Sequence, residues 1–287
     1  MPRPISFPPE FEKAVAGAAE AGVFPDGSPG RFLCGERAAG IARRYGLAPR
    51  QADEAALAGG VIPLRYVRNA KAFSPAEQLA LLRSRTALIG LGGLGGHILE
   101  LLVRAGAGTI LCADGDVFEE SNLNRQLLSE DAALGRDKAE AAVRRAGRIN
   151  PTITVTAYRE FLDEGAMEAL CEGADAAVDA LGGRRDRPAL SRAARKAGIP
   201  LVTGAAAGLT GYVAVVAPDG PGPEDFFGGP AGPAAEDDLG CPGPGVAAVA
   251  ALQAAEVLKI LCGREPALTG SMLLIDLGDM SFERVRL

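Results

Sequence analysis

A glycine-rich turn between a predicted strand and a predicted helix constrains this chain more than any other feature. The strand TALI (86–89) runs into GLGGLG (90–95), and a helical stretch follows as far as Ala105. Glycines in this context allow backbone N–H groups at a helix N-terminus to approach a phosphate closely. A tight turn without a ligand is the structural alternative. The predicted nucleotide-binding glycines are Gly90, Gly92, Gly93 and Gly95.

Short β-prone runs alternate with helical stretches from Thr86 onward. The runs are TALIGLG, TILCADGD, TITVTAY, ADAAVDAL and PLVTGAAA. Such alternation is typical of βαβ units in a doubly wound parallel sheet. The later runs GYVAVVAP, SMLLIDL and FERVRL follow one another with fewer helical connections, so some of them pair antiparallel. We therefore expect an α/β protein with a Rossmann-like doubly wound mixed sheet.

The first 60 residues lack this alternation. Phe11, Val15 and Ala19 recur at helical spacing, and a weaker helical pattern begins at Ile41. We expect an N-terminal helical accessory segment over residues 1–60 and a nucleotide-binding domain over 61–287.

A glycine- and proline-rich stretch interrupts the second half of the chain between Ala217 and Gly245. It predicts a long surface loop, and loops of that length are either functional or disordered. Val246–Leu261 then reads as an apolar helix ending before Gly263, with Gln253, Glu256 and Lys259 forming a polar stripe.

Composition excludes several classes of protein. The 287 residues carry a net charge of −6 with scattered Lys and Arg, so we expect no nucleic-acid partner. The start of the chain has no targeting pattern and no apolar run is long enough to cross a bilayer, so we expect a cytoplasmic protein without membrane contact. The five cysteines lack framework spacing, which favours free thiols. His97 is the only histidine, and a packing or hydrogen-bonding role is expected for it.

Polar residues follow the second predicted strand. Asp114 stands at the end of that strand, where a carboxylate can accept the ribose hydroxyls of either NAD or ATP. The stretch SNLNRQ (121–126) contains Arg125, whose guanidinium matches phosphate geometry. A surface salt bridge is the alternative role for Arg125.

Lys138 is a more specific signal. Asp137 and Glu140 resemble a capping box, which puts Lys138 on the first helical turn, where the helix dipole disfavours a cation by roughly 0.3–1 kcal/mol. A neighbouring anion would reverse that sign. The position therefore favours a triphosphate nearby over a solvated lysine.

At these residues the sequence resembles the ThiF/MoeB/HesA adenylyltransferases, relatives of the ubiquitin-activating enzymes, from about Arg65 to Leu287. The motifs that carry the resemblance are RYVRN (65–69), GLGGLGG (90–96), DGD and SNLNRQ (114–126), LGRDK (134–138), INP (149–151), VDAL with Arg187 (178–187), PLVTGAAAGLTG (200–211) and LQAAEVLK (252–259). The resemblance implies transfer of AMP from ATP, with Mg²⁺, to the C-terminal glycine of a ubiquitin-like sulfur-carrier protein ending in Gly-Gly.

The resemblance also implies roles for single residues. The glycines would lie along the nucleotide and Asp114 on its ribose. Asn122, Arg125 and Lys138 would hold the phosphates, and the neighbouring Gln126 belongs to the same nucleotide-binding stretch. Arg68 would reach the ATP site of a neighbouring subunit, which implies a homodimer.

The sequence departs from the family pattern in three places. Gly182 and Gly183 stand where members usually carry a Mg²⁺-binding aspartate, and Asp179 or Asp186 could substitute. The paired C-x-x-C motifs of many members are missing, so we expect no zinc. Cys241 lies near where some relatives carry a reactive cysteine, and an incidental loop thiol is the alternative.

Two other functions remain open from the sequence. Without its metal aspartate, the fold could bind a nucleotide as a docking or regulatory protein. A NAD-dependent dehydrogenase shares the glycine turn and Asp114, but it has no hydride-transfer role for Arg125 or Lys138.

Overall fold

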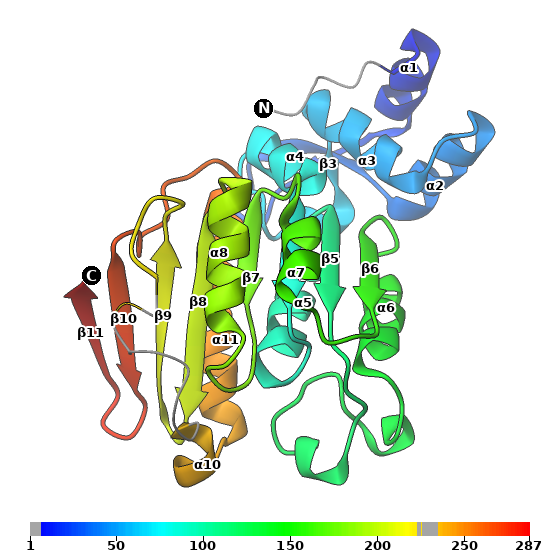
Figure 1. The fold of residues 1–287 in the computed structure, drawn as a ribbon. Coiled ribbons are helices and arrows are strands. Elements are labelled where there is room, and N and C mark those ends of the chain that lie inside the picture. The colour runs from blue at the N-terminus through cyan, green and yellow to red at the C-terminus, as the bar shows by residue number, and fades with distance from the viewer. Residues whose placement is uncertain (1–6, 223–224, 226–234) are drawn as a thin grey trace.

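An eight-stranded sheet organises the chain in the computed structural model, which describes residues 7–222, 225 and 235–287 (Figure 1). From one edge to the other, its strands are β11 (Ser281–Arg286), β10 (Ser271–Asp276), β9 (Thr210–Val216), β8 (Leu201–Ala207), β7 (Ala176–Asp179), β4 (Arg85–Ile89), β5 (Thr109–Ala113) and β6 (Thr154–Tyr158).

The sheet is mixed, as expected. Strands β8, β7, β4, β5 and β6 pair in parallel, whereas β8 to β11 form an antiparallel meander. A tight turn at Gly208 joins β8 to β9, and its φ of 58° is a conformation that glycine adopts readily. The predicted Rossmann-like α/β class is thus confirmed.

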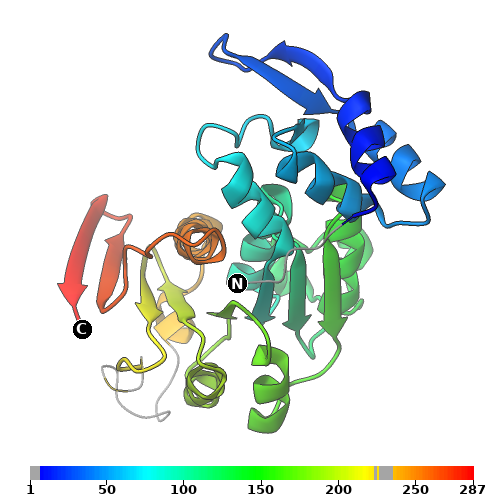
Figure 2. The same cartoon turned by 90° about the horizontal axis from the view of Figure 1, so that it is seen from above.

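Helices cover both faces of the parallel part (Figures 1 and 2). One face carries α5 (Gly93–Ala105), α6 (Lys138–Ile149) and α11 (Gly243–Leu261), and the other carries α7 (Glu164–Cys171) and α8 (Arg187–Ala197). Successive side chains of a strand point to opposite faces of the sheet, so each strand contributes side chains to both helical layers. In β4, Leu88 packs into the α5 layer, while Ala87 and Ile89 pack into the α7 and α8 layer.

Helix α11 is the longest helix of its layer. The expectation that no apolar run is long enough to cross a bilayer was wrong for this helix, whose length and mean hydropathy of 1.5 would suffice. Half of its apolar stretch is, however, buried inside the protein. Two members of the predicted polar stripe, Gln253 and Glu256, are buried. Gln253 donates from Nε2 to the carbonyl of Asp179 at 2.9 Å, and Glu256 accepts from the amide of Leu268 at 3.0 Å. These buried polar groups tie the helix to the sheet.

The N-terminal segment has its own small core of Phe11, Val15, Leu33 and Ile41. Its elements are α1 (Pro9–Ala18), β1 (Glu20–Val23), β2 (Pro29–Leu33), α2 (Gly35–Arg44), α3 (Pro49–Ala58) and β3 (Ile62–Pro63). The expected helices form, but a purely helical segment was wrong for residues 20–33. A turn closes the β1–β2 hairpin there, with Gly27 at φ 82° and Asp26 accepting from the amide of Ser28.

This segment joins the main sheet at the amino ends of the parallel strands. Arg50 donates to the carbonyl of Gly108 and to Oγ1 of Thr109, where β5 begins. The connection to β4 then runs through η1 (Leu64–Tyr66) and α4 (Pro75–Arg83). Open α/β sheets bind ligands at the opposite end, where the parallel strands have their carboxyl ends. The N-terminal segment does not cover that end (Figure 1).

Three short elements lie around the carboxyl ends of the parallel strands: η2 (Glu120–Asn122), η3 (Asp131–Ala133) and α10 (Ala235–Leu239). Helix α10 forms within the stretch expected to lack regular structure, and α11 begins at Gly243 rather than Val246. Residues 223–224 and 226–234 of that stretch lie outside the described residues.

Candidate functional site

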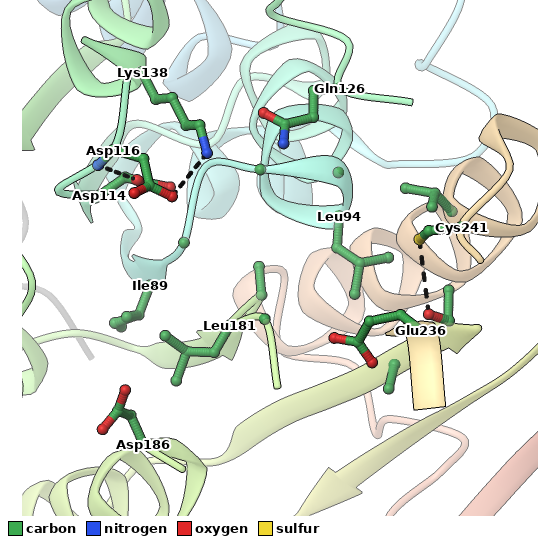
Figure 3. Close-up of a pocket in the computed structure, with 18 of the residues that line it drawn as sticks. Ile89, Leu94, Asp114, Asp116, Gln126, Lys138, Leu181, Asp186, Glu236 and Cys241 are labelled. Carbon is green, nitrogen blue, oxygen red and sulfur yellow. Dashed lines mark hydrogen bonds and ion pairs between the residues drawn. The ribbon is translucent and has the colours of Figure 1, made fainter. Parts of the chain in front are cut away.

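A cavity of about 570 Å³ opens at the carboxyl ends of β4, β5 and β7 (Figure 3). This volume suits a small-molecule ligand. Its walls come from segments far apart in sequence: the glycine turn, the loop after β5, the start of α6, and α10 with the start of α11. Of the sequence-predicted residues, the cavity is lined by Gly90, Gly92, Gly93, Asp114, Arg125, Gln126, Lys138, Asp186 and Cys241.

The glycine turn needs its glycines for steric reasons. A Cβ at Gly90, which has φ 96°, would lie 2.3 Å from the carbonyl oxygen of Ala180. A Cβ at Gly95 would lie 1.9 Å from the carbonyl oxygen of Gly90. Gly95 therefore permits close packing of α5 on the turn and does not line the cavity. Gly92 is the N-cap of α5 and has no side chain to satisfy the helix amides, so these amides remain available to an anion.

Asp114 is held in place by the backbone. Its Oδ2 accepts from the amide of Leu91 at 2.7 Å and its Oδ1 from the amide of Asp116 at 2.9 Å. Because the carboxylate lines the cavity and each oxygen keeps further acceptor capacity, Asp114 is positioned to receive ligand hydroxyls.

Lys138 is the first residue of α6, as predicted, but the capping box does not form. The side chain of Asp137 makes no capping bond and lies instead 3.2 Å from Arg159. Lys138 is 5% exposed, and its ammonium lies 2.9 Å from Oδ2 of Asp116 (Figure 3). A buried cation at the positive end of a helix therefore already has one anionic neighbour inside the protein.

Arg125 and Gln126 enter the cavity from the loop after η2. Arg125 is partly buried and donates from Nη1 to the carbonyl of Ser121 and to Oδ1 of Asn124, both at 2.9 Å. Gln126 is 6% exposed, and its Oε1 has no hydrogen-bond partner among the described residues. A buried acceptor without a donor is costly, so Gln126 marks a position where a ligand donor or a cation fits.

Besides Gly95, three predicted residues are not among those lining the cavity. Asn122 is buried and stabilises its own loop by accepting from the amide of Glu119. Arg68 is exposed and precedes α4, on the side of the sheet where the N-terminal segment attaches. Asp179 lies behind the cavity wall and is 1% exposed.

Asp179 forms a buried ion pair with Arg187. Both residues belong to a motif that carries the resemblance, but the sequence did not predict their pairing. The Nη1 atom of Arg187 lies 2.8 Å from Oδ2 of Asp179, which also accepts from the hydroxyl of Thr203 at 2.7 Å. Arg187 further donates to the carbonyls of Leu181 and Gly183. The pair therefore fixes the backbone at the Gly182–Gly183 turn, and Asp179 is not available to a metal ion.

Cys241 lies in the cavity wall just before α11. Its Sγ lies 3.9 Å from the carbonyl oxygen of Ala206. Burial raises the pKa of the Cys241 thiol, although the nearby charge of Arg125 acts in the opposite direction. The structure thus supplies a cation that the sequence did not reveal, but the thiol remains mainly protonated at neutral pH.

Two further cavity residues had no sequence signal. Glu236 of α10 accepts from the amide of Gly183 at 3.0 Å. Phe161, which follows β6, is 76% exposed, and its ring would lie 2.6 Å from a Cβ at Gly115. With Leu162 and Met167, Phe161 gives the Asp114 side of the cavity an apolar wall. His97, by contrast, makes the expected structural contact, with Nδ1 2.9 Å from the carbonyl oxygen of Gly93.

Comparisons with known proteins match this region. Residues 66–287 match the model of the ThiF family. The SAMP-activating enzyme E1 of Haloferax volcanii is 35% identical over 74% of this chain and 79% of its own length. The molybdopterin-synthase adenylyltransferase of Escherichia coli is 33% identical over 78% of this chain and 92% of its own length. The sulfur carrier protein adenylyltransferase of Thermus thermophilus is 36% identical over 74% and 81%.

Solved structures share the fold. E. coli MccB bound to ATP superposes with a TM-score of 0.63 at 22% identity, over 77% of this chain and 70% of MccB. Selenomethionine PaaA gives a TM-score of 0.63 at 24% identity, over 78% and 70%. The family model covers most of the chain, including every residue that lines the cavity. The chain therefore belongs to the ThiF family.

Proposed function

We propose that this protein uses ATP to adenylate the C-terminal glycine of a ubiquitin-like sulfur-carrier protein ending in Gly-Gly. The observation that carries the proposal is the convergence of the glycine turn, Asp114, Arg125 and Lys138 on one cavity. The names of the relatives support the reaction, because they are adenylyltransferases or activating enzymes, one of them for a sulfur carrier protein.

The cavity offers a separate place for each part of ATP. Phe161 and Leu162 would contact the base, and the fixed carboxylate of Asp114 would accept from the ribose hydroxyls. The free amides at the start of α5, together with Arg125 and Lys138, would hold the phosphates. Lys138 would then exchange its contact with Asp116 for a phosphate oxygen. Asn122 would support Arg125 through the loop rather than bind phosphate itself.

The residues present also fit Mg²⁺. The unpartnered oxygen of Gln126 and the carboxylates of Asp186 and Glu236 line the same cavity, and Mg²⁺ sites often combine one or two carboxylates with substrate phosphates. Among the described residues, no group of three or more metal-ligating side chains forms a site by itself. When bound, Mg²⁺ would neutralise charge on the phosphates.

The reaction needs positioning more than a covalent nucleophile. A carboxylate oxygen of the carrier's last glycine attacks the α-phosphorus, the bond to the bridging oxygen of the β-phosphate breaks, and pyrophosphate leaves with that electron pair. The products are an acyl-adenylate and pyrophosphate. Lys138 and Arg125 would stabilise the charge that accumulates on the phosphates.

We further propose a cytoplasmic homodimer. Arg68 is exposed and is not part of the cavity of its own chain, so it is free to reach the cavity of a second subunit. The five cysteines are free thiols, which suits a reducing compartment.

Exchange of labelled pyrophosphate into ATP tests the proposed function. We expect exchange only when a carrier ending in Gly-Gly is present, and none when that carrier lacks its last glycine. ATP binding without exchange for any carrier would favour a nucleotide-binding docking protein instead. Absence of ATP binding would refute both functions.

A further inference from the structure

Helix α10 places an acidic side chain against the Gly182–Gly183 turn. Glu236 and Asp237 line the cavity, and Oε1 of Glu236 accepts from the amide of Gly183 at 3.0 Å. Figure 3 shows the carboxylate of Glu236 among the side chains of the cavity. The amide of Gly208 donates to the carbonyl of Gly240 at 2.8 Å, which ties the end of this segment to the turn after β8. The acidic residues therefore belong to the wall of the nucleotide cavity.

Two carboxylates near the phosphate side of the cavity already have cationic partners in the protein, whereas Asp186 and Asp237 also line the cavity. Asp179 is paired with Arg187 and accepts from Thr203. Asp116 is paired with Lys138. The hydrogen bond from Gly183 engages one oxygen of Glu236, so its second oxygen can take a ligand.

Gln126 provides an independent indication of a cation. Its Oε1 is buried in the wall of the same cavity and lacks a partner among the described residues. The amide of Gln126 lies beside Gly92, at the start of α5, where phosphates are expected. A triphosphate presents only acceptors, so it cannot satisfy this oxygen. A hydrated cation carried by the phosphates can do so.

Gly182 has no side chain, and Glu236 brings a carboxylate to the same turn. No atom lies within 4 Å of a Cβ built on Gly182, so this position supplies no side chain to the cavity and leaves room for one. Glu236 brings a carboxylate to the same turn from a different part of the chain. Building on the proposed function, we propose that Glu236 is the carboxylate through which this protein holds the Mg²⁺ of bound ATP, with Gln126 facing the hydrated ion.

Calorimetric titration with ATP, once with Mg²⁺ and once with EDTA, tests this role without measuring turnover. We expect Mg²⁺ to tighten ATP binding by the wild-type protein. Glu236→Gln should lose most of that gain, about tenfold in Kd, and should bind ATP in EDTA much as the wild type does. Asp238→Asn is the matched control, because Asp238 is exposed on the same helix and does not line the cavity. It should keep the full gain.

A second variant tests whether the carboxylate itself matters. Gly182→Asp in the Glu236→Gln background should restore the Mg²⁺-dependent gain, since the site has room for it. The assignment of Glu236 is overturned if Glu236→Gln keeps the full gain, or if it binds ATP more tightly in both buffers, as a carboxylate that merely repels phosphate would predict. Wild-type protein that binds no ATP in either buffer would overturn the proposed function itself.

Discussion

The ammonium of Lys138 lies 2.9 Å from the carboxylate of Asp116 while being almost fully buried at the start of α6. Asp116 itself is about half exposed, so water screens only one side of this pair. The lysine is thus pre-positioned at the cavity, and in the proposed function a phosphate oxygen would compete with Asp116 for it.

This competition predicts opposite effects for the two partners. Lys138→Ala should lower pyrophosphate exchange by roughly 10²–10³-fold, because one well-placed charge is lost. Asp116→Asn should bind ATP at least as tightly as the wild type, because the competing anion is gone. Lys196→Ala serves as the control, since its pair with Glu168 lies on the surface. Exchange by Lys138→Ala at the parental rate would contradict the role of Lys138.

Replacing Gly95 by alanine should destabilise the fold more than replacing Gly182, because Gly95 lies against the backbone of Gly90. A methyl group at Gly95 would lie 1.9 Å from the backbone oxygen of Gly90, and the turn must shift to admit it. We expect Gly95→Ala to lower the free energy of unfolding by about 1–3 kcal/mol and to weaken ATP binding. Gly182→Ala, which meets open space, should leave stability nearly unchanged. Urea denaturation of both variants is the measurement, and equal losses would refute the steric argument.

Residues close to the strand ends could be predicted from sequence. The glycine turn, Asp114 and Lys138 each lie next to a recognisable end of a strand or start of a helix. The local sequence pattern was therefore enough to predict that they meet at the carboxyl ends of the parallel strands. Glu236 could not be found in this way. Its contact with Gly183 spans 53 residues and follows a stretch without periodicity.

Two other features escaped sequence reasoning for different physical reasons. All four residues of β1 are exposed, so Glu20–Val23 shows no alternation of apolar and polar residues. The sequence predicts the polar stripe on α11 but not that two of its members, Gln253 and Glu256, are buried. In the fold, the buried carbonyl of Asp179 and the buried amide of Leu268 need hydrogen-bond partners, and Gln253 and Glu256 supply them. A sequence pattern does not reveal this need, because it arises from contacts distant in the chain.

The environment of Cys241 predicts slow, pH-dependent alkylation. Burial raises the pKa of the thiol above its ordinary value, so the reactive thiolate is scarce at neutral pH. Labelling of Cys241 by iodoacetamide should rise about tenfold per pH unit between pH 7 and 9. Arg125→Ala should slow it further, because the charge of Arg125 favours the thiolate. Mass spectrometry of the labelled peptide measures the rate, and fast labelling at pH 7 would contradict this prediction.

The buried carboxyl of Asp53 should make the free energy of unfolding decrease as the pH rises. This carboxyl is buried where α3 meets Arg65, whose Nε is 3.9 Å away, and burial raises the pKa of Asp53 from 3.8 to about 6. The folded protein therefore holds a proton that the unfolded chain releases between about pH 4 and 6, so stability decreases across that range and stays lower above it.

Asp53→Asn removes this titration while keeping the shape of the side chain. The variant should match the wild type within about 1 kcal/mol at pH 4.5 and exceed its free energy of unfolding by about 1–3 kcal/mol at pH 8, where the wild-type carboxylate is charged and buried. Urea denaturation at both pH values measures the difference. If Asp53→Asn were less stable than the wild type at pH 8, the ion pair with Arg65 would outweigh the cost of burying the charge.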